Sequence, residues 1–147
     1  MLLESDKNII GLPKFIHTSV YKNNKVYKLK KLEFSMLLSK KSIISINEEF
    51  DNGHVVNEGS LDFAINTARK SDNWLKSLAI LVRAILIDHI FEDGNKRTAA
   101  AVVVAWLEME NLHCNIDSVN KLIIKILKKN ITSLNEIIEL IKNATEE

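Results

Sequence analysis

The chain has 147 residues, a formal net charge of +1 and 46% apolar residues, which fits one folded domain and argues against a disordered chain. The near-neutral charge argues against a nucleic-acid-binding protein, and the single cysteine excludes an internal disulfide. The scarcity of glycine and proline favours helices, so we expect an all-α protein. The amino terminus lacks the pattern of a signal peptide, and the longest apolar run, Ala99 to Leu107, is too short to cross a membrane. We therefore expect a soluble, cytoplasmic protein with no membrane partner.

Residues 1–50 are predicted to form an N-terminal segment made of a hairpin and a helix. β-Forming residues flank Asn23-Asn24, and asparagine tolerates the positive φ that a hairpin turn needs. Apolar residues at helical spacing then predict a helix within residues 31–50. We expect this segment to pack on a core formed by residues 51–147, so that the chain is one domain overall.

The stretch from Asp51 to Gly59 has the pattern of a turn, a short strand and a second turn. Glycines and asparagines bracket Val55-Val56, which are good strand formers. Ser60 is the predicted N-cap of the helix that follows, because apolar residues begin at helical spacing directly after it.

Four helices are predicted in the rest of the chain. The first two are apolar on nearly all sides, which predicts a buried central pair, and the small residues Ala99 to Ala101 permit close packing between them. The last two are amphipathic. The predicted bounds are Asp72 or Asn73 to His89, Asn95 to about Asn111, Asp117 or Ser118 to Lys129, and Ser133 to Asn143.

The loop between the two central helices, His89 to Thr98, holds the functional groups. His89 can take a proton near neutral pH, and Asp93 can either hold a divalent cation or cap the next helix. Gly94 lets the backbone pass close to a ligand, and the free N–H groups of Gly94, Asn95 and Lys96 would form an anion site at the start of the helix. A base, a metal ligand and an anion site within a few residues indicate phosphoryl or nucleotidyl transfer to a hydroxyl.

This loop resembles the motif of the Fic/Doc (Fido) family, His-x-Phe-x-Asp/Glu-Gly-Asn-x-Arg. The matching residues are His89, Phe91, Asp93, Gly94, Asn95 and Arg97, without a gap. The resemblance covers roughly residues 51–115 and implies a Fic/Doc-type helical bundle with a small β-hairpin flap. It also implies ATP as substrate, Mg²⁺ as cofactor and a target protein whose Ser, Thr or Tyr hydroxyl is modified.

The resemblance also implies a role for each matching residue. His89 would deprotonate the target hydroxyl, Asp93 would hold Mg²⁺, and Phe91 would anchor the loop to the core. Phosphate contacts are assigned to four residues, through main-chain N–H groups or side-chain donors: Gly94, Asn95, Lys96 and Arg97. The flap would bind the target as an added strand, and by position its candidate residues are Gly53, His54, Val55, Val56 and Asn57.

Two positions depart from the pattern of the members that transfer AMP. Lys96 stands where many have Gly, and Ala100 stands where they have a second Arg that contacts phosphate. Lys96 brings the motif closer to the Doc branch, whose prototype phosphorylates a translation factor, whereas Gly94 differs from the Ala of that branch. We favour AMP transfer, with Doc-like transfer of the γ-phosphate as the alternative.

Other interpretations concern regulation and binding. A catalytically silent helical interaction module is the non-enzyme alternative, and the lysines at 121, 125, 128 and 129 are better explained as a solvated helix face than as a dock for an acidic partner. Ser45 to Glu49 and Thr132 to Glu136 have the spacing of the family's inhibitory motif, but the wrong residue follows each glutamate. We therefore favour an external, antitoxin-like inhibitor over self-inhibition, and a homo-oligomer stays open.

Overall fold

The computed structural model describes residues 38–113 and 115–146, and within these ranges the chain forms six α-helices. Their bounds are α4 Lys40–Glu48, α5 Glu58–Lys70, α6 Trp74–Ile87, α7 Asn95–Met109, α8 Ile116–Lys129 and α9 Leu134–Glu146. The all-α fold predicted from the sequence is confirmed. The predicted hairpin around Asn23-Asn24 and the first part of the helix expected within residues 31–50 lie outside the described residues.

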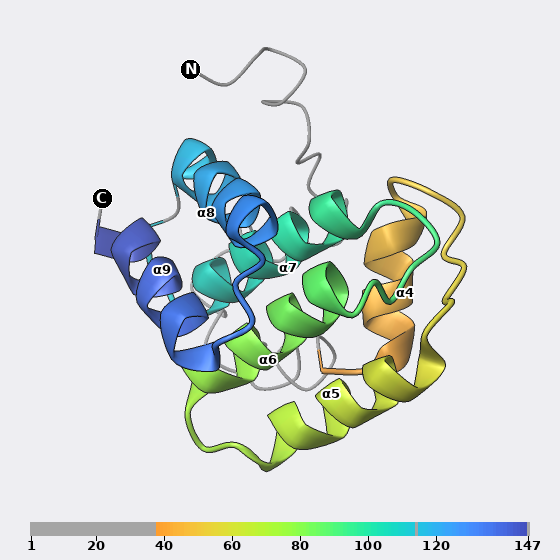
Figure 1. Ribbon diagram of the computed structural model, residues 1–147. Coiled ribbons are helices and arrows are strands. Elements are labelled where there is room, and N and C mark those ends of the chain that lie inside the picture. Colours follow the sequence, from red (N-terminus) through yellow and green to blue (C-terminus); the bar gives the residue numbers. More distant parts are fainter. Residues whose placement is uncertain (1–37, 114, 147) are drawn as a thin grey trace, which may run out of the picture.

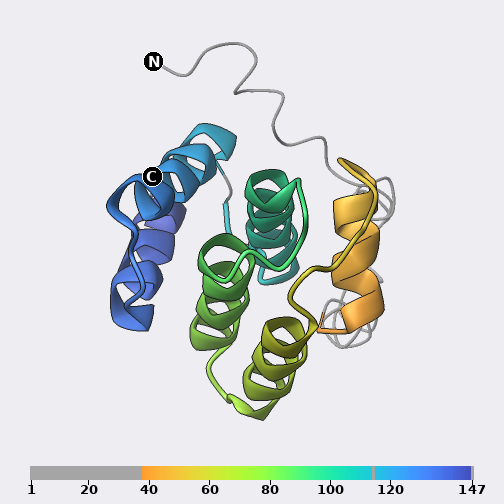
Figure 2. The ribbon, with the colours of Figure 1, turned by 45° about the vertical axis from the view of Figure 1, so that its right-hand side comes forward.

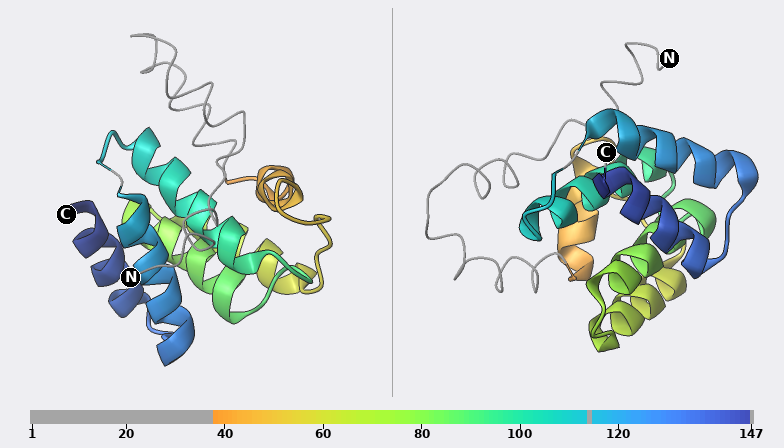
Figure 3. Two further views of the ribbon diagram at one scale, coloured as in Figure 1. Left: turned by 90° about the horizontal axis from the view of Figure 1, so that it is seen from above. Right: turned by 90° about the vertical axis from the view of Figure 1, so that its left-hand side faces the viewer.

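The helices form three layers, with α6 and α7 in the middle (Figures 1 and 2). The pair α8 and α9 lies on one side of them, and α4 and α5 lie on the other, an arrangement also visible from above (Figure 3). In the central layer α6 contacts α7, and each also packs against helices of the outer layers. The loop between α6 and α7 therefore leaves the middle of the bundle and lies next to α4.

The central pair is buried because its sequence is apolar on every side. Every residue from Thr98 to Leu107 is buried, and so is every residue of α6 from Ser77 to Val82. Ala99, Ala100 and Ala101 are fully buried, as expected for small residues at a close helix contact. Within the described ranges, no helix combines the length and apolarity that crossing a membrane requires.

Asparagine side chains cap three of the helices. Asn73 caps α6 as predicted, but α5 begins earlier than expected: its cap is Asn57, whose side chain accepts from the N–H of Ser60. Asn115, rather than Asp117 or Ser118, caps α8. In both corrected cases the asparagine is the first residue able to satisfy the free amides of the helix, so the helix starts there.

An ionic contact ties α4 to α5 beneath the loop that joins them. Lys40 forms ion pairs with Glu58 and with Asp62, the latter at 3.2 Å. Hydrogen bonding to Glu58, and then to Asp62, raises the pKa of Lys40 above its ordinary value. A lysine is charged at neutral pH in any case, so the contact is present there, and the raised pKa of Lys40 extends it to more alkaline solution.

The flap is not a hairpin. In residues 51–57, Val55 forms a single antiparallel bridge to Phe91, and no regular strand occurs within the described residues. The short segment pairs with the loop between α6 and α7 instead of folding back on itself, because the loop supplies the partner backbone that a second flap strand would have given.

Candidate functional site

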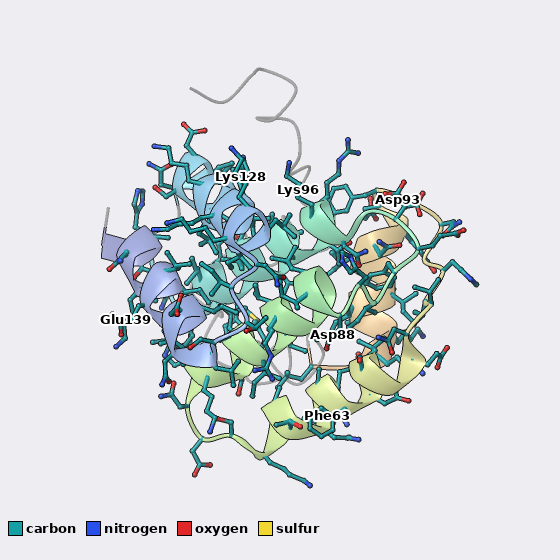
Figure 4. All side chains as sticks on the ribbon, in the orientation of Figure 1. Phe63, Asp88, Asp93, Lys96, Lys128 and Glu139 are labelled. Atoms are coloured by element: carbon teal, nitrogen blue, oxygen red, sulfur yellow. The ribbon has the colours of Figure 1, made fainter. Side chains whose placement is uncertain are left out.

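A cleft of about 680 Å³ opens at the end of the bundle where α6 stops and α7 begins. Figure 4 shows this end, with Asp88 after α6, and Asp93 and Lys96 at the start of α7. The predicted site residues His89, Asp93, Gly94, Asn95, Lys96 and Arg97 all line the cleft. Phe91 and the flap residues do not line it.

His89 is exposed and has an unusual backbone conformation. It comes directly after Asp88, the C-cap of α6, and its φ is 49°, in the left-handed region. Glycine or asparagine normally occupies this position after a helix, because a Cβ makes the conformation costly. Strain of this kind persists where the surroundings enforce it, often at functional sites, and here it places the imidazole at the cleft.

Phe91 anchors the loop, and Asn95 holds it in place. The Phe91 side chain is 1% exposed. Its N–H donates to Asn95 Oδ1 at 2.9 Å, and its carbonyl accepts from Asn95 Nδ2 at 2.8 Å. Both functional atoms of the Asn95 side chain thus bind the loop, and the second Nδ2 proton, which has no acceptor among the described residues, is left for the predicted contact with phosphate.

The free amides at the start of α7 are shifted by one residue from their predicted position. The Gly94 N–H, which was expected to be free, donates to Asp93 Oδ1 at 2.8 Å. The first hydrogen bond of α7 runs from Thr98 N–H to the Gly94 carbonyl at 2.9 Å. The N–H groups of Asn95, Lys96 and Arg97 therefore have no acceptor within the described part of the chain, and they open toward the cleft.

The charges around the cleft fit a magnesium nucleotide. Asp93 is exposed, and only one of its carboxylate oxygens accepts a hydrogen bond from the described residues. Lys96 and Arg97 form no ion pair within the described ranges, so both can meet an anion. The described residues hold no cluster of three or more metal-ligating side chains, but Mg²⁺ bound with phosphates needs only one or two carboxylates.

Gly94 is required by its backbone and by α4. Its φ is 77°, and a Cβ added there would lie 2.9 Å from the side-chain nitrogen of Asn47. The missing side chain makes room for Asn47, and because Gly94 also lines the cleft, the predicted close approach of a ligand stays a prediction. Glycine at this position therefore follows from packing and does not indicate which phosphate is attacked.

Asn47 was missed by sequence reasoning. It is fully buried near the end of α4, and its amide contacts Asp93, Thr98 and Gly53. The signal available in the sequence was a polar residue beside the buried positions Ile43 and Ile46. That signal alone does not distinguish a buried amide from one at a helix edge.

The flap residues are joined to the loop by main-chain hydrogen bonds. Val56 N–H donates to the Ile90 carbonyl at 2.8 Å, and His54 accepts from the Glu92 N–H at 3.0 Å. The Asn57 side chain donates to the Asp88 carbonyl at 3.0 Å. Because bonds on this side use residues 54 and 56, the N–H and carbonyl of Val55 point the other way.

The remaining wall of the cleft is apolar and was also missed. The apolar lining residues are Phe50, in the turn after α4, Leu86 in α6 and Leu127 in α8. No local pattern in the sequence links these three distant positions. Glu49 and Glu136, the glutamates of the two segments with the spacing of the inhibitory motif, do not line the cleft.

Comparisons of the chain with protein-family models, with curated proteins and with solved structures give no match.

Proposed function

We propose that this protein is a Fic-type, Mg²⁺-dependent transferase that moves AMP from ATP to a hydroxyl side chain of a target protein. The observation that carries the proposal is the convergence of three kinds of group in one cleft. These are the imidazole of His89, the carboxylate of Asp93, and the free amides at the start of α7. Such a set supplies a base, a cation ligand and an anion site.

The nucleotide phosphates lie on the amides of residues 95–97, with Lys96 and Arg97 adding positive charge. Asp93 would hold Mg²⁺, which when bound would supply positive charge against the phosphates. The apolar lining offers the nucleobase aromatic carbon at Phe50, on the α4 side of the cleft, or aliphatic carbon at Leu127, on the α8 side, and the base gains from burial against either.

In the transfer step, the target hydroxyl oxygen forms a bond to the α-phosphorus and its proton moves to the His89 imidazole. The bond from the α-phosphorus to the bridging oxygen breaks, and pyrophosphate leaves. Positioning and electrostatic stabilisation supply most of the acceleration, so the protein needs no covalent intermediate.

The flap holds the target. The Val55 N–H and carbonyl have no partner within the described ranges, and Val56 is 55% exposed. An extended segment of the target can add to this edge as a short strand. Because Val55 pairs with Phe91 in the loop that follows His89, a target strand docked on the outer edge is separated from that loop by the flap, at about 4.8 Å per strand spacing.

Transfer of the γ-phosphate is a second candidate function, and the alanine at position 100 favours it. Ala100 is fully buried in α7, so no side chain from this position reaches the cleft. The phosphate contact made by the second Arg of AMP-transferring relatives is then missing. A target that gains one phosphate in place of an AMP group, measured by mass spectrometry, would favour this candidate.

Binding of Mg·ATP tests the proposal independently of any target. Asp93→Asn keeps the oxygen that accepts from Gly94 N–H but removes the charge that Mg²⁺ requires. At about 100 times its Kd, a ligand stabilises the folded state by about 2.7 kcal/mol. We expect such stabilisation of the wild type by ATP with Mg²⁺ in a thermal unfolding experiment, and its loss in Asp93→Asn.

Glu92→Gln is the matched control, because Glu92 is the neighbouring carboxylate in the same cleft. It should keep the Mg²⁺-dependent stabilisation. Equal losses in both variants would contradict the assignment of Asp93, and no stabilisation of the wild type would contradict the proposed function.

A further inference from the structure

Asn47 joins three parts of the site through one buried side chain. Its Nδ2 donates to the Asp93 carbonyl at 2.9 Å and to Thr98 Oγ1 at 3.1 Å, and its Oδ1 accepts from the Gly53 N–H at 2.9 Å. The side chain has no exposed surface. All hydrogen-bonding atoms of the amide are therefore occupied, and each bond runs to a different segment.

These bonds bracket the anion site. Asp93 lies directly before the first turn of α7, and Thr98 directly after the three free amides. Thr98 itself donates to the Gly94 carbonyl at 2.7 Å, which closes a ring of hydrogen bonds through Asn47. The Gly53 bond fixes the base of the flap to the same point on α4.

We propose that Asn47 is a positioning residue that sets the Asp93 carboxylate and the free amides of α7 relative to the flap. This inference rests on the proposed function and adds a residue outside the motif to its machinery. It acts through Asp93, Thr98 and Gly53 and does not line the cleft. Outer partners of this kind orient the groups that contact metal and phosphate, and their loss typically weakens binding.

Two variants separate the bonds that Asn47 donates to Asp93 and Thr98 from the bond that it accepts from Gly53. Asn47→Asp keeps the size of the side chain and an acceptor for Gly53, but it loses the donor to Asp93 and Thr98 and places a negative charge beside a carbonyl. Asn47→Ala loses all the bonds. Asn120→Ala is the matched control, because Asn120 is another buried amide, on α8, and does not line the cleft.

Amide hydrogen exchange without nucleotide measures the loop directly. In Asn47→Asp we expect faster exchange at Gly94 and Thr98 and an unchanged rate at Gly53, whereas Asn47→Ala speeds exchange at all three. In Asn120→Ala these rates should match the wild type. If neither Asn47 variant folds, Thr98→Val removes the contact with Asn47 together with the bond from Thr98 to the Gly94 carbonyl, and Thr98→Ser keeps both. Faster exchange at Gly94 in Thr98→Val and wild-type exchange in Thr98→Ser then support the inference.

Titration with Mg·ATP then measures the consequence. The Kd of Asn47→Asp should rise about tenfold, in the range typical of lost outer partners, while Asn120→Ala keeps the wild-type Kd. Unchanged exchange at Gly94 and Thr98 together with a Kd within twofold of the wild type would overturn the inference. A wild type that binds no Mg·ATP contradicts the proposed function, and the exchange rates still decide whether Asn47 positions the loop.

Discussion

The side chain of Asn95 takes the place of a neighbouring strand for Phe91. In the bridge to Val55, the N–H and carbonyl of Phe91 point away from the flap. The Asn95 amide satisfies both of these groups with bonds of 2.9 and 2.8 Å. The side chain of Phe91 is buried, and the N–H and carbonyl of this residue are thus hydrogen-bonded without a second strand.

Removal of this amide should destabilise the fold. Asn95→Ala loses two hydrogen bonds, each with a net contribution of about 1 kcal/mol, so we expect a loss of about 2 kcal/mol in the free energy of unfolding. Urea denaturation measures it. Asn66→Ala, an exposed position on α5, should change the free energy by less than about 0.5 kcal/mol. Equal effects of the two substitutions would contradict the structural role of Asn95.

The two glycines at 94 and 59 should respond to alanine in opposite ways. An alanine at Gly94 would have to adopt a φ of 77°, and its Cβ would press against the Asn47 amide. We therefore expect the free energy of unfolding to fall by about 2 kcal/mol or more. At Gly59, in α5, no atom lies within 4 Å of an added Cβ, and alanine should stabilise by up to about 1 kcal/mol. Thermal unfolding of both variants tests this prediction. A Gly94→Ala variant with the stability of the wild type would show that Asn47 of α4 is not in close contact with the loop.

At the scale of elements, the flap and the loop form one paired unit. Its hydrogen bonds come from His54 and Val56 of the flap, while the N–H and carbonyl of Val55 point away from the loop. Proline, which lacks an N–H, should therefore be tolerated at Val55 and not at Val56, its neighbour.

The pair Val55→Pro and Val56→Pro tests how the target binds. Val55→Pro should keep the wild-type stability within about 1 kcal/mol and lose labelling of the target, because it removes only the outward N–H. Val56→Pro breaks the bond to the Ile90 carbonyl and should lower the melting temperature. Full labelling by Val55→Pro would contradict target binding by strand addition.

Helices were predictable from the sequence, and the contacts between loops were not. The spacing of apolar residues located α6 and α7 to within a few residues, because both helices are apolar along most of their length. The cap at Asn57 was missed, since Ser60 is an equally good capping residue and only the bridge from Val55 to Phe91 determines where the helix starts.

At the scale of the whole molecule, the central helix pair carries the site and the outer layers complete it. The cleft takes Phe50 from the end of α4 and Leu127 from α8, which lie on opposite sides of the pair. The motif residues could be found from their spacing. Asn47 and the apolar wall could not, because their roles arise from the packing of segments far apart in sequence.

The central claim is that His89 activates a hydroxyl for attack on the α-phosphorus of ATP in this cleft. Its most direct test is incubation of the protein in a cell lysate with ATP labelled at the α-phosphate and, separately, at the γ-phosphate, beside the variant His89→Ala. We expect a protein labelled from the α-phosphate only, with the label lost in His89→Ala. Labelling from the γ-phosphate alone, or equal labelling by His89→Ala, would contradict it.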